Sequence, residues 1–190
     1  MLKDYHIILS SNSPRRKELL AGLDIDFEVH VIKGIDESYP SNLPAMEIAE
    51  YIAVKKAEAY KEELHGNNLV ITADTVVVAG DEILGKPKNM DDACAMLEKL
   101  SGQTHKVVTG VCLTSANNQK HFSVVTEVTF KVLSYEEITY YVNHYKPLDK
   151  AGAYGIQEWI GYIGVTSISG SYFNVMGLPV QRIYEELNRF

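Results

Sequence analysis

Cysteine is scarce in this sequence, and its scarcity excludes two kinds of scaffold. Among the 190 residues only Cys94 and Cys112 are cysteines, and they are far apart and form no Cys-x-x-Cys pair. The six histidines include no pair at metal-ligand spacing. Neither a zinc site nor a disulfide framework is therefore indicated, and a reducing cytoplasm is the expected location.

Long apolar runs and an excess of positive charge are also lacking. No run reaches transmembrane length, and the N-terminal stretch MLKDYHIILSS lacks the long apolar core of a signal peptide, so we expect no membrane partner. The formal net charge is -7, whereas binding to nucleic-acid phosphates needs a basic face. We therefore expect no nucleic-acid partner, although one small anion could still bind in a locally basic cleft.

The chain has the composition of a globular protein, with 46% hydrophobic and 23% charged residues. Short β-type runs alternate with amphipathic helical patterns, which predicts an α/β fold in a single domain, residues 1–190. The expected strands are residues 5–9, 27–32, 69–79, 106–114 and 121–133, the last two forming a hairpin. The expected helices are residues 14–23, 44–64, 90–100, 135–146 and 179–188. Residues 149–179 show poor periodicity and are expected to form loops.

The segment LSSNSPRRKELL is the first candidate for a binding site. Ser13 is the expected N-cap and Pro14 the first residue of a helix that follows a strand, which places backbone N–H groups and the positive end of the helix dipole at the strand's exit. Arg15 and Arg16 then lie in the first turn, where the dipole disfavours cations. Guanidinium groups in that position favour a bound phosphate, although a simple cap with solvated arginines explains the pattern equally well.

Asp74 is unusual because it lies inside the apolar run VITADTVVVAG. Burying an unpaired carboxylate is costly, so Asp74 requires a cation, a metal or several hydrogen bonds beside it. A general base or metal ligand has these surroundings. The alternative is a structural aspartate at a strand bulge or turn.

The stretch from Gly80 to Lys86 nearly matches a phosphate-binding P-loop. Pro87 follows the lysine, however, where that motif requires the hydroxyl of Ser or Thr to bind magnesium. Residues 80–82 are also more typical of a hairpin turn, so the P-loop interpretation fails. Lys86 remains a candidate as a single positive charge, and a solvated surface lysine is the alternative.

The other candidates are weaker when each is taken alone. Glu37, in the segment GIDESYP, is a loop carboxylate that could hold a divalent ion. Lys55 and Lys56 lie on the expected long helix, where a solvated face is the usual explanation.

Taken together, these segments resemble the Maf-type nucleoside triphosphate pyrophosphatases. The matching segments follow the family order from residue 9 to residue 180: LSSNSPRRKELL, AVKKA, ADTVV, GKP, LSGQTHKVVTG, TEVTF, DKAGAYGIQ and GSYFNVMGLPV. The segment DKAGAYGIQ is similar to that of the branch that acts on dTTP and UTP.

The resemblance implies a fold, an activity and a set of site residues. The implied fold is a mixed twisted sheet flanked by helices, with two lobes around a deep cleft, similar to inosine triphosphate pyrophosphatases; a homodimer is also suggested. Asp74 would be the catalytic base and, with Glu37, would hold Mg²⁺ or Mn²⁺. The substrate-binding residues would be Ser11, Ser13, Arg15, Arg16, Lys56, Thr75, Lys86 and Gln157.

One local departure concerns the residue after Gln157. The family commonly has glycine there, whereas this chain has Glu158 followed by Trp159. A negative side chain and an indole beside Gln157 could alter the choice of base.

Two rival functions remain open at this point. A nucleotide-binding regulator of cell division would use the same cations without turnover, but Asp74 and Glu37 favour turnover. An RNA-binding protein is disfavoured by the acidic net charge and by the lack of a basic stripe with interleaved aromatics.

Overall fold

A computed structural model of the protein describes residues 5–190. Residues 1–4 lie outside the described part, and the sequence-based expectation about a signal peptide concerns the stretch that they begin. The chain divides into two compact units. Unit 1 consists of Met1–Asp74, Thr109–Val124 and Gly177–Phe190, and unit 2 consists of Thr75–Val108 and Val125–Met176. None of the helices described in residues 5–190 has the length and apolarity needed to span a bilayer.

The predicted mixed α/β architecture is confirmed. The strand order is β2-β1-β3-β5-β6-β7, and β4 pairs with β3. Strand β1 is parallel to β2 and β3, whereas β4 is antiparallel to β3 and β7 is antiparallel to β6. Three long strands contribute residues to both units: β3 (Asn68–Ala79), β5 (Thr104–Ser115) and β6 (Gln119–Phe130).

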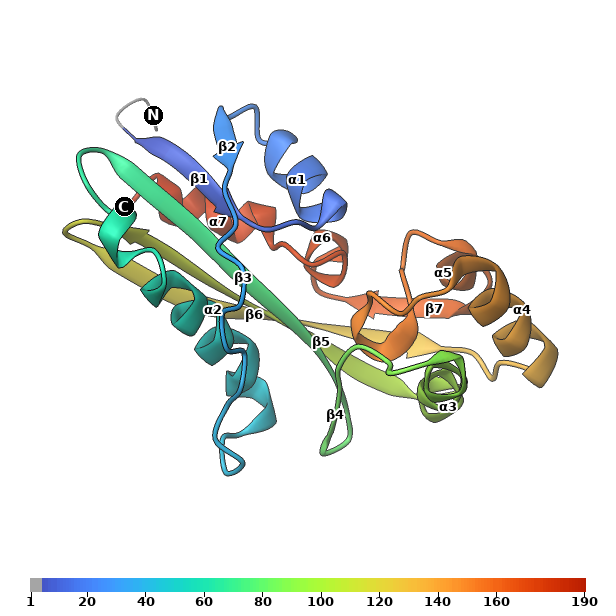
Figure 1. The fold of residues 1–190 in the computed structure, drawn as a ribbon. Coiled ribbons are helices and arrows are strands. Elements are labelled where there is room, and N and C mark those ends of the chain that lie inside the picture. The colour runs from blue at the N-terminus through green and yellow to red at the C-terminus, as the bar shows by residue number, and fades with distance from the viewer. Residues whose placement is uncertain (1–4) are drawn as a thin grey trace. The chain divides into compact units, whose positions relative to one another are not determined.

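Unit 1 carries helices on both faces of its strands. In Figure 1 α2 passes in front of the strands and α7 behind them. Besides its parts of the long strands, the unit contains β1 (His6–Ser10), α1 (Pro14–Ala21), β2 (Phe27–Val29), η1 (Ala45–Glu47), α2 (Ile48–Glu58), η2 (Lys61–Glu63) and α7 (Val180–Leu187).

Helix α2 lies unusually close to β5, and Gly110 makes this possible. A Cβ atom at Gly110 would be 2.2 Å from the carbonyl carbon of Ala49 and 2.2 Å from the backbone nitrogen of Glu50. The hydroxyl of Thr72 in β3 also donates a 2.6 Å hydrogen bond to the carbonyl of Ala53 in α2. These contacts fix α2, and with it the lysines near its C-terminal end, against the sheet.

Unit 2 surrounds a large apolar core that includes Leu97, Phe130, Tyr141 and Tyr154. Its own elements are β4 (Glu82–Leu84), α3 (Met90–Leu100), α4 (Tyr135–Tyr145), η3 (Ala151–Ala153), α5 (Trp159–Gly164), β7 (Val165–Ser169) and α6 (Tyr172–Val175). The capping box predicted at the start of α4 is confirmed.

Three predictions about local structure were wrong. The helix expected over residues 44–64 is regular only over Ile48–Glu58, with short 3-10 turns on either side. The strand expected over residues 27–32 ends at Val29. Residues 149–179, expected to be loops, contain η3, α5, β7 and α6. Strand β7 forms by pairing with β6, a contact between distant residues that the local sequence does not indicate.

Candidate functional site

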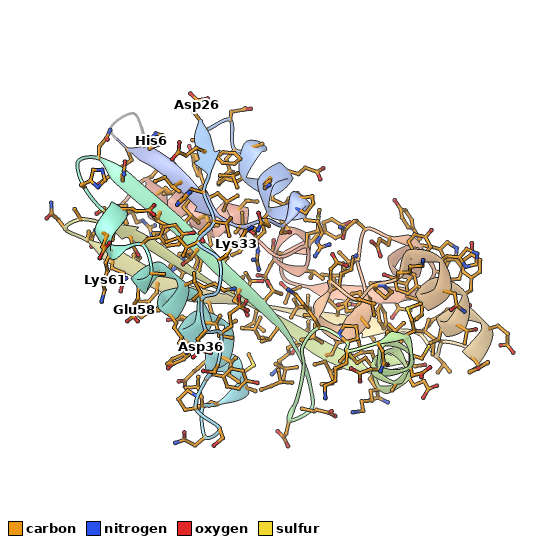
Figure 2. The ribbon with its side chains drawn as sticks, in the orientation of Figure 1. His6, Asp26, Lys33, Asp36, Glu58 and Lys61 are labelled. Carbon is orange, nitrogen blue, oxygen red and sulfur yellow. The ribbon has the colours of Figure 1, made fainter. Side chains whose placement is uncertain are left out.

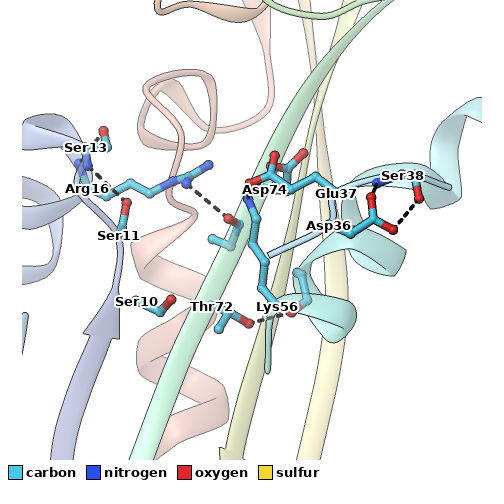
Figure 3. A network of polar contacts seen from close by, with 12 residues as sticks. Ser10, Ser11, Ser13, Arg16, Asp36, Glu37, Ser38, Lys56, Thr72 and Asp74 are labelled. Atoms are coloured by element: carbon cyan, nitrogen blue, oxygen red, sulfur yellow. Dashed lines mark hydrogen bonds and ion pairs between the residues drawn. The ribbon is translucent and has the colours of Figure 1, made fainter. Parts of the chain in front are cut away.

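Asp74 lies in β3 just beyond the point where the neighbouring parallel strand β1 ends. Ser10, the last residue of β1, is paired with Thr72 of β3, so β3 continues past the end of β1 and carries Asp74 with it. The Nζ atom of Lys56 donates a 2.8 Å hydrogen bond to Oδ1 of Asp74 and lies 3.1 Å from Oε1 of Glu37 (Figure 3). The Asp74 side chain is 16% exposed and that of Lys56 is 13% exposed. The carboxylate in the apolar strand therefore has the cationic partner that its burial requires.

Lys56 is not on a solvated helix face, which corrects the usual explanation considered for this lysine. It extends from α2 to both carboxylates, whereas Glu37 itself is 55% exposed. One ammonium group thus brings together two acidic side chains that are distant in sequence.

The neighbouring Lys55 fixes the loop that carries Glu37. Its Nζ atom donates to Oδ2 of Asp36 at 2.7 Å, to the carbonyl of Ser38 at 2.9 Å and to Oγ of Ser38 at 3.2 Å. Asp36 also accepts hydrogen bonds from the backbone N–H and the hydroxyl of Ser38. These hydrogen bonds from Lys55 and Ser38 hold the pKa of Asp36 well below its usual value. Figure 2 shows Asp36 beside α2, with Glu58 and Lys61 near the C-terminal end of that helix.

Arg16 is held by backbone carbonyls near Asp74. Its Nε atom donates to the carbonyl of Gly177 at 2.8 Å, and Nη1 donates to the carbonyl of Ala73 at 3.0 Å. Burial lowers the pKa of Arg16, the Asp74 charge opposes this effect, and the neighbouring Arg15 charge lowers the pKa further. Since an arginine remains protonated in proteins, Arg16 supplies a fixed positive charge beside the catalytic candidate.

The serines before α1 contact backbone groups at the start of the helix. The hydroxyl of Ser13 accepts a hydrogen bond from the N–H of Arg16 at 3.4 Å, as its predicted role as N-cap requires. The hydroxyl of buried Ser11 accepts a hydrogen bond from the N–H of Ser13 at 3.2 Å. Pro14 is the first helical residue, and Arg15, in the first turn, is partly exposed.

The structure therefore brings most of the predicted site residues into unit 1. Asp74 and Glu37 each contact Lys56, and Arg16 interacts electrostatically with Asp74. Thr75, Lys86 and Gln157 belong to unit 2. Thr75 follows Asp74 in β3, Lys86 is exposed after β4, and Gln157 is partly buried before α5.

The donor set fits a divalent metal that binds together with its substrate. Within residues 5–190, no group of three or more His, Cys, Asp or Glu side chains could hold a metal ion. Asp74 and Glu37 nevertheless converge on one cation, the ammonium group of Lys56. Mg²⁺ is commonly bound by one or two carboxylates while substrate phosphates and water complete its coordination, and this pair meets that requirement.

The residues that the sequence interpretation missed are those that hold the site together. Asp36 and Ser38 anchor the Glu37 loop to Lys55, and Tyr60 donates a hydrogen bond to Oγ of Ser10 at 2.7 Å, at the end of β1. The acid and hydroxyl on either side of Glu37 were the available signal, because such side chains often close a turn.

The combination of fixed cations and a paired carboxylate at a strand edge suits a protein that binds and hydrolyses a polyphosphate. Comparison with known families gives the class: residues 6–190 match the family described as Maf-like protein. The chain belongs to this family, and the resemblance found from its motifs is confirmed.

Curated relatives are similar over almost their whole length. A dTTP/UTP pyrophosphatase from Phocaeicola vulgatus is 63% identical over 188 residues, which cover 99% of this chain and 97% of the relative. Proteins of the same name from Parabacteroides distasonis and Bacteroides thetaiotaomicron are 58% and 55% identical, and the matches cover 98% and 97% of those relatives and 100% and 99% of this chain. Among solved structures, a HAM1 protein from Coxiella burnetii matches 98% of this chain and 100% of its own at 16% identity, with a TM-score of 0.48.

Proposed function

We propose that this protein is a nucleoside triphosphate pyrophosphatase that hydrolyses dTTP and UTP to the monophosphate and pyrophosphate. The observation that carries the proposed chemistry is the Asp74 carboxylate, held at 2.8 Å by Lys56 within a largely apolar strand. The names of the curated relatives, which are 55–63% identical, support the choice of nucleotides.

In the proposed reaction, water attacks the α-phosphorus and the bond from that phosphorus to the oxygen bridging to the β-phosphorus breaks. Asp74 orients the water and accepts its proton. Pyrophosphate leaves with the bridging oxygen and its electron pair. Reactions of this kind depend on in-line positioning and charge stabilisation more than on covalent catalysis.

The cations of the site have the task of stabilising the triphosphate. Arg16 is fixed by two backbone carbonyls, so its orientation is set before substrate binds. Lys56 can transfer its ammonium contact from the two carboxylates to a phosphate oxygen. Lys86 is proposed as a third cation, with the hydroxyls of Ser11 and Ser13 near the phosphates.

Asp74 and Glu37 would hold the divalent cation, Mg²⁺ or Mn²⁺. When bound, such an ion supplies Lewis acidity to the phosphate oxygens and lowers the pKa of water. We assign the choice of base to Arg15, Thr75 and Gln157. We further propose a cytoplasmic role in clearing normal or modified pyrimidine triphosphates from the nucleotide pool, with the protein acting as a homodimer.

The test is a panel of UTP, dTTP, CTP, ATP and GTP with Mg²⁺ or Mn²⁺, in which orthophosphate and pyrophosphate are measured separately. Pyrophosphate from UTP and dTTP, with an equal amount of monophosphate, is the expected result. Orthophosphate as the sole product would mean that a different bond is broken. Tight nucleotide binding without any product would instead support a regulator that does not turn over its ligand.

A further inference from the structure

Gln157 lies in a tight turn that immediately precedes α5. The N–H of Glu158 donates a 3.0 Å hydrogen bond to the carbonyl of Gly155, which closes a four-residue turn with Gln157 in its third position. The side chain of Glu158 does not extend outward beside Gln157. It instead turns back toward the interior of unit 2.

Two side chains from other parts of unit 2 hold the Glu158 carboxylate. The hydroxyl of Tyr141, in α4, donates a hydrogen bond to Oε2 of Glu158, and Nζ of Lys150 lies 3.2 Å from Oε1. The Lys150 side chain is only 9% exposed and that of Glu158 is 22% exposed. Lys150 has a second acidic partner in Asp149, at 2.8 Å.

The same tyrosine hydroxyl also binds the first residue of the turn. The N–H of Gly155 donates a 3.0 Å hydrogen bond to Oη of Tyr141, so this one atom contacts both Gly155 and Glu158. Burial raises the pKa of the Tyr141 hydroxyl, and the Glu158 carboxylate raises it further. Tyr141 therefore remains protonated and keeps donating to the carboxylate at neutral pH.

Gly155 leaves room for the Glu158 side chain, which fills the space beside it. A Cβ atom at Gly155 would be 2.8 Å from Cδ of Glu158 and 3.0 Å from Oε2. Both ends of the turn are thus fixed, by a hydrogen bond between backbone groups and by a shared side-chain partner.

We propose that Glu158 is a positioning residue: held by Tyr141 and Lys150, it fixes the turn that presents Gln157 and thereby sets the discrimination between nucleotide bases. This proposal rests on the proposed function. It also gives the expected influence of Glu158 on the choice of base a structural route, through the turn that carries Gln157. Partly buried ion pairs add little net stability, so conformational specificity is a better explanation for keeping one under this turn.

A double-mutant cycle tests whether Glu158 acts through Gln157. The variants are Glu158→Gln, Tyr141→Phe, Gln157→Ala and the double variant Glu158→Gln/Gln157→Ala, and the quantity is the ratio of kcat/KM for UTP to that for GTP. Each single change is expected to reduce this ratio by roughly tenfold, while the double variant falls no further than Gln157→Ala alone. Additive losses, or an unchanged ratio in both Glu158→Gln and Tyr141→Phe, would overturn the proposal.

Two matched controls separate positioning from general damage. Glu82→Gln removes a carboxylate from an exposed pair with Lys99 in the same unit, and Tyr140→Phe removes the hydroxyl of the adjacent, exposed tyrosine. Both are expected to keep the wild-type ratio. If Glu158→Gln only lowers the thermal midpoint and leaves the ratio unchanged, Glu158 is a stabilising residue and not a positioning residue.

Amide hydrogen exchange judges the proposal even if the proposed function fails. Exchange at Gly155 and Glu158 is expected to be roughly tenfold faster in Glu158→Gln than in the wild type, while α3 keeps its protection. Unchanged exchange at the turn would contradict the proposal whatever nucleotide the protein hydrolyses. Absence of pyrophosphate from every nucleotide with the wild-type protein would contradict only the proposed function.

Discussion

The two units of the protein place charged groups in opposite ways. In unit 1, Lys56, Asp74 and Glu37 meet where β3 continues past the end of β1, and Glu37 remains more than half exposed at 55%. In unit 2, Lys150 and Glu158 form an ion pair beneath a turn, and Glu158 also accepts a hydrogen bond from the fully buried Tyr141. The first arrangement leaves a carboxylate accessible to a ligand, whereas the second places most of the Lys150 and Glu158 side chains out of solvent.

This difference suggests that one group of charged residues serves the hydrolysis and the other serves the choice of nucleotide base. A lysine that bridges two carboxylates can release them to a metal or a phosphate, because each partner has an alternative ion to bind. Lys150 also contacts Asp149, but its side chain is largely enclosed with that of Glu158, and removing one partner of such a pair is costly, so this pair is suited to keeping a fixed geometry. We therefore expect changes at Lys56, Asp74 or Glu37 to reduce turnover and changes around Glu158 to alter the choice of base.

The largest effect should follow from Asp74→Asn. Removing the proposed base is expected to lower kcat for pyrophosphate release by about 10²–10⁴-fold, while the fold is kept because Glu37 still neutralises Lys56. Steady-state assays and circular dichroism measure the two quantities. Asp81→Asn, at an exposed turn in unit 2, is the control. Near-parental turnover in Asp74→Asn would show that this residue is not the catalytic base. The proposed contrast between the charged groups of the two units would then be wrong.

Acid should weaken unit 2 through His105. Burial lowers the pKa of His105 to about 4 from the ordinary value of 6.5, so the unfolded chain binds a proton between these pH values and the folded chain does not. Stability is therefore present above pH 6.5 and is lost as the pH falls toward 4, by about 3 kcal/mol from this residue.

Urea unfolding followed by the fluorescence of Trp159, the single tryptophan, reports on unit 2 directly. His105→Gln is expected to flatten the loss of stability between pH 7 and pH 4, whereas His65→Gln, at an exposed residue of unit 1, should leave the loss unchanged. Equal pH dependence in the wild type and His105→Gln would show that the pKa of His105 is the same in the folded and unfolded chains, which would contradict the prediction.

The smallest effects are expected from substitutions of the two adjacent lysines of α2. Lys56→Met removes a charge-assisted contact to Asp74 and should lower kcat/KM by roughly 10–100-fold. Lys55→Met only loosens the Asp36–Ser38 anchor, so the loss should be roughly two- to fivefold, with weaker binding of Mn²⁺ in the presence of nucleotide. Equal losses in the two variants would mean that the two lysines do not have separate roles.

Local signals in the sequence predicted the parts of the fold that depend on neighbouring residues. Ser13 caps α1 through the N–H of Arg16, and the Ser134–Glu137 capping box opens α4, because both motifs lie within one helical turn. The need of Asp74 for a partner also followed from its apolar surroundings, and Lys56 meets that need.

Other features depend on contacts between distant residues and could not be predicted. The helix expected over residues 44–64 stops at Glu58, and shortly afterwards Tyr60 turns inward to contact Ser10 and His30. The inward course of Glu158 depends on Tyr141, 17 positions earlier in the chain. No pattern around Gln157 indicates that its acidic neighbour is directed away from solvent.

The glycine at position 110 limits which substitutions the protein can accept. The backbone of α2 lies so close to Gly110 that the space beside this residue holds only a hydrogen atom. One added methyl group would therefore push α2 away from β5 and move the ammonium groups of Lys55 and Lys56 away from Asp36 and Asp74. Any residue other than glycine is therefore disfavoured at position 110, although this residue touches none of the reacting groups. The positions of the Lys55 and Lys56 ammonium groups thus depend on how closely β5 lets α2 approach the sheet.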